Sequence, residues 1–110
     1  MPLPRPLEKD IQAGICDYLA LRGHFFWRQN TTPIFDKNRG GFRAMPKHSF
    51  SGLPDIMLVQ FGTGRLIGLE VKRPRGKQSE GQELFMMRLR NSGGEYHLVH
   101  SIDEVIALGL

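Results

Sequence analysis

Two strongly apolar segments, residues 55–61 and 64–72, lie close together in the chain and constrain its fold more than any other feature. Gly62 and Thr63 separate them, and glycine at the first central position suits a type II′ turn, which favours an antiparallel β-hairpin. Side chains alternate between the two faces of such a hairpin. One face carries Ile56, Leu58, Ile67, Leu69 and Val71, and the other carries Met57, Val59, Phe61 and Leu66. A hairpin that is apolar on both faces is expected at the centre of a sheet, covered on each side.

The flanking segments predict helices on either side of such a sheet. Apolar residues recur every four positions from Leu7 to Leu19, which indicates an amphipathic helix ending near Gly23. Ser79 and Gln82 have the spacing of a capping box at the start of a second helix. The remaining predicted elements are an aromatic strand at 24–29, a strand at 96–100 and a short helix after residue 101. The predicted fold class is α/β, a mixed sheet flanked by helices in the order α-β-β-β-α-β-α.

The length of the chain fits one domain. With 110 residues, of which 40% are hydrophobic, it can bury a continuous core without disulfides or a structural metal. We therefore expect a single domain over residues 1–110, with a flexible N-terminus at 1–6. Residues 30–52 are polar, basic and rich in Gly and Pro, and they predict a long loop with a functional role.

Charge and cysteine content restrict the classes of protein. Fifteen Lys and Arg residues against eleven Asp and Glu give a net charge of +4, which suits a polyanionic partner but also an ordinary basic surface. A single cysteine, Cys16, provides neither a disulfide framework nor a cysteine zinc site, so a reducing, cytoplasmic environment is expected. No apolar run approaches the roughly 20 residues that cross a bilayer, so no membrane association is expected.

The predicted turn sets a register that brings two carboxylates together. If Gly62 and Thr63 are the central turn residues, Asp55 lies directly opposite Glu70, with Cβ atoms about 4.5–5.5 Å apart. Two unpaired negative charges at that separation are costly, and a hard divalent cation such as Mg²⁺ would remove the repulsion. A slip of one residue would break the pair, so the prediction depends on the register.

Lys72 lies on the same strand face as Glu70, one pleat further along. A metal held by two carboxylates supplies Lewis acidity and lowers the pKa of bound water, as phosphodiester hydrolysis requires. Lys72 would orient or deprotonate that water, or stabilise the transition-state charge while protonated; the residues leave both roles open. An isolated Glu-x-Lys is more often a same-face salt bridge. Its combination with Gly52-Leu53-Pro54-Asp55 at the end of a buried hairpin favours a site.

Pro54-Asp55 followed by Glu70-Val71-Lys72, in this order of elements, resembles the PD-(D/E)xK nuclease superfamily, whose core is that of restriction endonucleases. Three segments are similar to the VRR-NUC group, the virus-type replication and repair nucleases: residues 51–55, 70–73 and 79–82. The similarity extends from about Leu7 to Val105. The group's Val-Arg-Arg stretch reads Val71-Lys72-Arg73 here, and lysine is usual in the wider superfamily.

The resemblance implies roles for individual residues. Asp55 and Glu70 would bind Mg²⁺, with Mn²⁺ as a substitute, together with the carbonyl of Val71, and Lys72 would be the catalytic lysine. Glu8 matches an acidic residue that such nucleases place near the metal, and Gln82 matches a glutamine close to the catalytic centre. Each has a simpler alternative, because Glu8 suits the first turn of a helix and Gln82 completes a capping box.

Basic residues on both sides of the hairpin are candidates for nucleic-acid contacts, with solvated loops as the alternative. They are Arg73, Arg75 and Lys77 after the hairpin, and Lys37, Arg39, Arg43 and Lys47 in the loop at 30–52. None suggests base readout, so recognition of DNA shape, a junction or an end is expected. The resemblance to Holliday-junction resolvases implies a homodimer, with the terminal strand or exposed aromatic residues at its interface.

These features together predict a metal-dependent, structure-specific DNA endonuclease of a bacterium or phage, acting on branched or junction DNA, with a Holliday-junction resolvase as one form of it. The alternative from another class is a non-catalytic nucleic-acid-binding or assembly protein that retains the nuclease fold.

Overall fold

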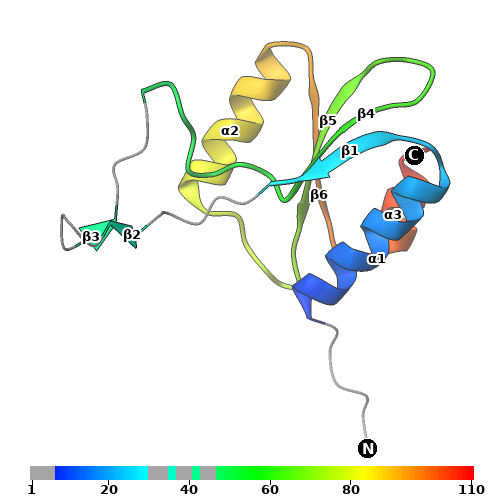
Figure 1. Ribbon diagram of the computed structural model, residues 1–110, viewed down its shortest axis with the longest axis horizontal. Helices are drawn as coiled ribbons and strands as arrows, with labels where there is room; N and C mark the ends of the chain where they lie inside the picture. The colour runs from blue at the N-terminus through cyan, green and yellow to red at the C-terminus, as the bar shows by residue number, and fades with distance from the viewer. Residues whose placement is uncertain (1–6, 30–34, 37–40, 43–46) are drawn as a thin grey trace, which may run out of the picture.

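The computed structural model describes residues 7–29, 35–36, 41–42 and 47–110. Its elements follow the chain as α1 (Glu8–Leu21), β1 (Phe25–Arg28), β2 (Phe35–Asp36), β3 (Gly41–Phe42), β4 (Ile56–Val59), β5 (Leu66–Val71), α2 (Glu80–Asn91), β6 (Glu95–Val99) and α3 (Ile102–Ala107). Four strands form a mixed sheet in the order β1-β4-β5-β6, antiparallel except for the parallel β5–β6 pair. Helices α1 and α3 lie on one face of this sheet and α2 lies on the other (Figure 1). The predicted fold class is therefore confirmed.

The central hairpin keeps the predicted register but has a longer turn. Val59 pairs with Leu66 and Met57 with Gly68, as expected. The prediction of a two-residue turn is wrong. The amide of Gln60 donates to the carbonyl of Arg65 (2.9 Å) and the amide of Gly64 donates to the carbonyl of Gln60 (3.0 Å), so residues 61–64 form the loop. Compared with the predicted turn, the loop is one residue longer on each side, so the pairing of the two strands beyond it is unchanged.

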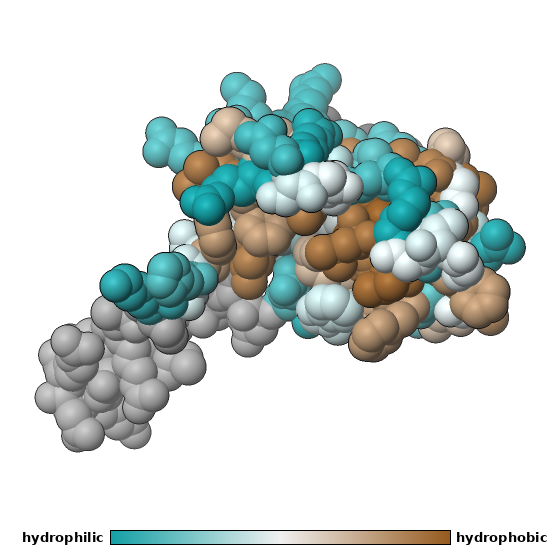
Figure 2. Space-filling model, turned by 90° about the horizontal axis from the view of Figure 1, so that it is seen from above, coloured by the Kyte–Doolittle hydropathy of each residue, from teal (hydrophilic) through white to brown (hydrophobic). Residues whose placement is uncertain are grey.

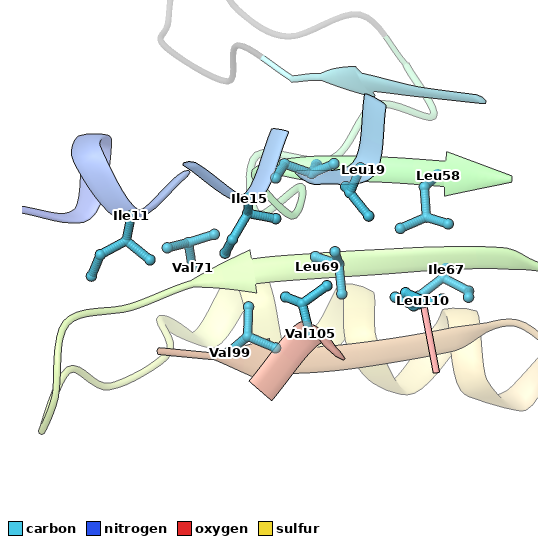
Figure 3. Packing of buried hydrophobic residues seen from close by; sticks show 11 residues of the cluster. Ile11, Ile15, Leu19, Leu58, Ile67, Leu69, Val71, Val99, Val105 and Leu110 are labelled. Atoms are coloured by element: carbon cyan, nitrogen blue, oxygen red, sulfur yellow. The ribbon is translucent and has the colours of Figure 1, made fainter. Parts of the chain in front are cut away.

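The core lies between α1, α3 and the sheet. Ile11, Ile15 and Leu19 of α1 are buried at the four-residue spacing seen in the sequence, and their side chains point toward β4 and β5 (Figure 3). All five residues predicted for this face of the hairpin belong to the same buried cluster. The hydroxyl of Tyr18 donates to the carbonyl of Leu110 (2.7 Å), which ties the C-terminus to α1.

The other face of the hairpin is covered only in part. Met57 is buried, but Phe61 and Leu66 are 75% and 39% exposed, so the prediction of full cover on both sides is wrong for the end of the hairpin near the turn. The reason is the position of α2, which packs against β6 rather than over the middle of the sheet. Apolar surface therefore lies open between hydrophilic areas (Figure 2).

The loop predicted at residues 30–52 contains regular structure. Strands β2 and β3 pair antiparallel within it, Phe35 with Phe42, and form a sheet of their own. The predicted flexible segment at 1–6 lies outside the described residues. Among the helices in the described part of the chain, none is long and apolar enough to cross a membrane.

Candidate active site

A proline interrupts the β4–β5 ladder and places Asp55 beside β5. Asp55 is the residue before β4, and the register that pairs Ile56 with Leu69 puts it opposite Glu70. One step further, the partner of Val71 would be Pro54, whose carbonyl accepts from Nε2 of Gln29 (3.0 Å). The amide of Val71 donates instead to Oδ2 of Asp55 (2.8 Å). The carboxylate thus takes over the end of the ladder and is fixed against the backbone of β5.

Glu70 lies beside Asp55 as a buried acid. It is 1% exposed, and it is the only charged residue of the described part of the chain that is buried to this degree. Nε2 of Gln82 donates to its Oε1 (2.7 Å), and the hydroxyl of Tyr96 donates to its Oε2 (3.2 Å). Burial, followed by the charge of Asp55 and a hydrogen bond with it, raises the pKa of Glu70 to about 8. In the absence of a cation, this raised pKa favours the protonated form of Glu70.

Lys72 extends from the same face as Glu70, as the alternation predicted. Its Nζ lies 3.9 Å from Oε1 of Glu70, and its side chain is 17% exposed. Its amide donates to the carbonyl of Val99 (3.0 Å), so the backbone is fixed by the ladder with β6. The close Glu-x-Lys contact expected of a same-face pair is thus present, and it lies beside Asp55.

Tyr96 is a site residue that was not predicted from the sequence. Tyr96 is 1% exposed and pairs with Gly68 across the parallel β5–β6 ladder. A Cβ at Gly68 would lie 3.3 Å from Cδ2 of Tyr96, so the glycine makes room for the ring to pass toward Glu70. The glycine within an otherwise bulky strand was the available signal, but a parallel register cannot be deduced from sequence.

Helix α2 enters the site at its N-terminus. The capping box is confirmed, because the amide of Gln82 donates to Oγ of Ser79 (3.2 Å) and Oε1 of Gln82 accepts from the amide of Ser79 (2.9 Å). The first turn packs directly on the segment before β4, where a Cβ on Gly52 would lie 2.1 Å from the carbonyl carbon of Gly81. This contact holds Gln82 against Glu70.

Glu8 lies at the same end of β5 without joining the acid pair. Its Oε1 accepts a hydrogen bond from the amide of Arg73 (3.3 Å). In residues 7–29 and 47–110, no three His, Cys, Asp or Glu side chains come together as a metal site. The groups that can hold a cation are the carboxylates of Asp55 and Glu70 and the carbonyl of Val71. In an antiparallel ladder the carbonyl of Val71 points to the same side as its N–H. On that side it faces Pro54, which has no N–H to donate to it.

The basic residues after β5 remain exposed. Arg73, Arg75 and Lys77 follow Lys72 directly, and Arg75 has a positive φ of 71° after Pro74, which turns the chain. Lys47 is also exposed. Lys37, Arg39 and Arg43 lie outside the described residues.

Two acids and a lysine thus lie at the end of a central hairpin, in a mixed sheet with helices on both faces. The sequence profile of the VRR-NUC domain matches residues 29–103. A solved structure of a VRR-NUC domain superposes with a TM-score of 0.64 at 20% identity, covering 92% of this chain and 91% of that one. None of the curated proteins compared with the chain matches it. The chain belongs to the VRR-NUC domain family, which confirms the resemblance seen in its motifs.

Proposed function

We propose that this protein is a metal-dependent endonuclease that hydrolyses phosphodiester bonds of DNA. The observation that carries the proposal is the buried acid Glu70 beside Asp55, with the Nζ of Lys72 3.9 Å from it. Two carboxylates side by side in a buried place are costly when both are ionised, whereas a cation between them removes the repulsion.

The donor set suits Mg²⁺, with Mn²⁺ as a substitute. Mg²⁺ prefers oxygen ligands and is usually held by one or two carboxylates, with water and substrate phosphate completing its coordination. Asp55, Glu70 and the Val71 carbonyl supply three such oxygens. Asp55 is oriented by the amide of Val71, and Glu70 by Gln82 and Tyr96, so each carboxylate is already fixed by a second residue.

When bound, Mg²⁺ would supply Lewis acidity at the phosphate and lower the pKa of a water molecule. The residues of the chain would position the phosphate and the carboxylates. Lys72 brings a positive charge to the phosphate and can donate to one of its oxygens or orient the attacking water. Gln82 and Tyr96 hold Glu70 in one orientation beside Asp55.

Exposed cations next to the acids would hold the DNA backbone. Arg73, Arg75 and Lys77 follow Lys72 without interruption by an acidic residue. The positive φ of Arg75 is unusual for a residue with a side chain and turns this segment sharply at the end of β5. Contacts of this kind position a duplex without reading its sequence.

We further propose that the substrate is branched DNA, with a Holliday junction as one form, and that two copies act together as a homodimer. One chain carries one acid pair and can cut one strand, so symmetric cleavage of a junction needs two copies. β1 and β6 are the two edge strands of this sheet, and we propose the outer edge of β6 as the place where the second copy docks.

The test is a cleavage assay on labelled four-way junctions, flaps, nicked duplexes and linear duplexes, with Mg²⁺ or Mn²⁺ and then with EDTA. Cleavage is expected with metal only and is expected to fall at least a hundredfold in Asp55→Ala and Lys72→Ala. Asp103→Ala and Arg22→Ala change exposed residues of the same charge away from the acid pair and serve as matched controls.

Several outcomes would contradict the proposal. Activity that persists in Asp55→Ala or Lys72→Ala would place the chemistry elsewhere. Metal-independent binding of these DNAs without cleavage of any of them would favour a non-catalytic nucleic-acid-binding protein. Sedimentation of the DNA complex as a single copy would exclude the homodimer.

A further inference from the structure

The edge strand β1 carries two aromatic side chains, Phe25 and Trp27, on the same face of the sheet as the acid pair. Trp27 pairs with Met57, Met57 with Gly68, and Gly68 with Tyr96, so these four residues form one row across the sheet. Directly opposed residues share a face, and Tyr96 reaches Glu70 from this row. Asp55 and Glu70 lie two residues further along β4 and β5 than Met57 and Gly68, so they form the next row on the same face.

The two ends of this row differ in cover. Helix α2 packs against β6 and buries Tyr96, whereas Phe25 and Trp27 on the opposite edge strand are 69% and 40% exposed. Their rings lie side by side, with centroids 5.5 Å apart. Two adjacent exposed aromatic residues on one strand are candidates for a binding surface.

On the side of the acid pair nearer to β1 lies Asp55, the less buried of the two acids. Asp55 is partly exposed while Glu70 is buried, and Asp55 belongs to the strand segment next to β1. Trp27 and Asp55 are diagonal neighbours, which places their Cα atoms about 7–8 Å apart. A strand whose phosphate reaches Asp55 thus brings a neighbouring base within reach of Trp27.

We infer that Phe25 and Trp27 form a stacking platform for unpaired bases of a nucleic-acid strand next to the bond that is cut. This inference deepens the proposed function and rests on it. Aromatic side chains stack on any base, but a base within a duplex is already stacked on its neighbours. Among branched DNAs, the platform therefore favours those with unpaired nucleotides at the cleavage point, such as a flap or a single-stranded arm, over a fully paired junction.

The surroundings favour nucleic acid over a second copy of the chain as the occupant. The exposed cations Arg73, Arg75 and Lys77 follow Lys72 at the end of β5, which is also the end that carries Glu70. The chain as a whole has a net charge of +4. A second copy seated on Phe25 and Trp27 would also obstruct the side from which Asp55 is reached. Stacking combined with a basic track is the usual arrangement for single-stranded DNA.

Trp27 is the only tryptophan, so its fluorescence reports on this surface alone. The chain is titrated in EDTA with a thymidine oligonucleotide, a flap and a blunt duplex, while the anisotropy of labelled DNA measures binding independently. Quenching of the tryptophan emission is expected with the oligonucleotide and the flap and not with the blunt duplex. Binding of the oligonucleotide or the flap without quenching, or no binding of either, would overturn the inference.

Variants separate stacking from folding. Trp27→Ala and Phe25→Ala are expected to weaken binding of the flap about tenfold and to leave binding of the blunt duplex unchanged, whereas Trp27→Phe retains most of the affinity. Ile106→Ala removes an exposed apolar side chain of α3, on the other face of the sheet, and is the control. Equal loss for flap and duplex in Trp27→Ala and Trp27→Phe would contradict the platform.

Two further outcomes are distinguishable. Quenching by the flap in a protein that cleaves no DNA would overturn the proposed function and support the platform, because the titration contains no metal. Emission that changes with protein concentration in the absence of DNA, together with a dimer in sedimentation that Trp27→Ala dissociates, would show a second copy on this surface and overturn the inference.

Discussion

The side chain of Gln82 bonds to Glu70 and to the start of its own helix at the same time. Its Nε2 donates to Oε1 of Glu70 (2.7 Å), and its Oε1 accepts from the amide of Ser79 (2.9 Å). The amide group is thus held at both ends, so it cannot turn without losing one of the bonds. The cap of α2 and the orientation of the buried acid therefore depend on one residue.

Substitutions at the two ends of the capping box should separate these roles. Ser79→Ala removes the cap and should cost about 1 kcal/mol of unfolding free energy without changing cleavage. Gln82→Glu keeps a residue that completes the box but loses the donor to Glu70, and it should lower metal affinity or cleavage about 10- to 100-fold. Denaturant unfolding and cleavage rates measure the two effects. Equal activity in both variants would show that the Gln82 contact is only structural.

The contact between Gly52 and Gly81 gives a sharp test of how α2 is placed. Gly52→Ala would bring its Cβ within 2.4 Å of the backbone N of Gln82, so α2 must move away from the sheet, at a cost of about 3 kcal/mol or more. Gly81→Ala is the matched control, since its Cβ meets ordinary contacts of 3.4–3.5 Å. Thermal unfolding of the two variants makes the comparison. Similar melting temperatures would contradict the close packing.

The raised pKa of Glu70 sets the direction of a pH effect on stability. Because this pKa is about 8 in the folded protein against an ordinary 4.5, the folded state keeps a proton that the unfolded chain releases between these values. The free energy of unfolding should therefore fall as pH rises from about 4.5 to 8, by up to about 5 kcal/mol over the whole window. Urea unfolding in EDTA at pH 5 and pH 8 measures it. Glu70→Gln should flatten this dependence, and an unchanged slope in that variant would contradict the assignment.

The hydroxyl of Tyr96 should influence that same proton. Its hydrogen bond lowers the pKa of Glu70, so Tyr96→Phe should move the pH-dependent loss of stability to higher pH and destabilise the protein by about 1–2 kcal/mol. Tyr18→Phe is the matched control, because it removes a hydroxyl bonded to the carbonyl of Leu110 and leaves the acid pair untouched. A pH profile that shifts equally in both variants would show a general effect of lost hydrogen bonds.

Local pattern was enough to predict much of this fold. The four-residue spacing of Ile11, Ile15 and Leu19 corresponds to the buried face of α1, and the spacing of Ser79 and Gln82 corresponds to the observed cap. Both follow from periodicities that neighbouring residues impose on a helix. The pairing across the hairpin was also predicted correctly, because a turn that lengthens by one residue on each side leaves the register unchanged.

Contacts between distant segments were not predictable in the same way. The sequence alone determined that Asp55, Glu70 and Lys72 share one face of a hairpin, since alternation along two adjacent strands requires it. Only the tertiary structure decided that Tyr96 and Gln82 would meet Glu70, that α2 would leave Phe25 and Trp27 exposed, and that the pKa of Glu70 would rise. The physical reason is that desolvation depends on which segments cover a residue, and that cover is set by the packing of elements far apart in the chain.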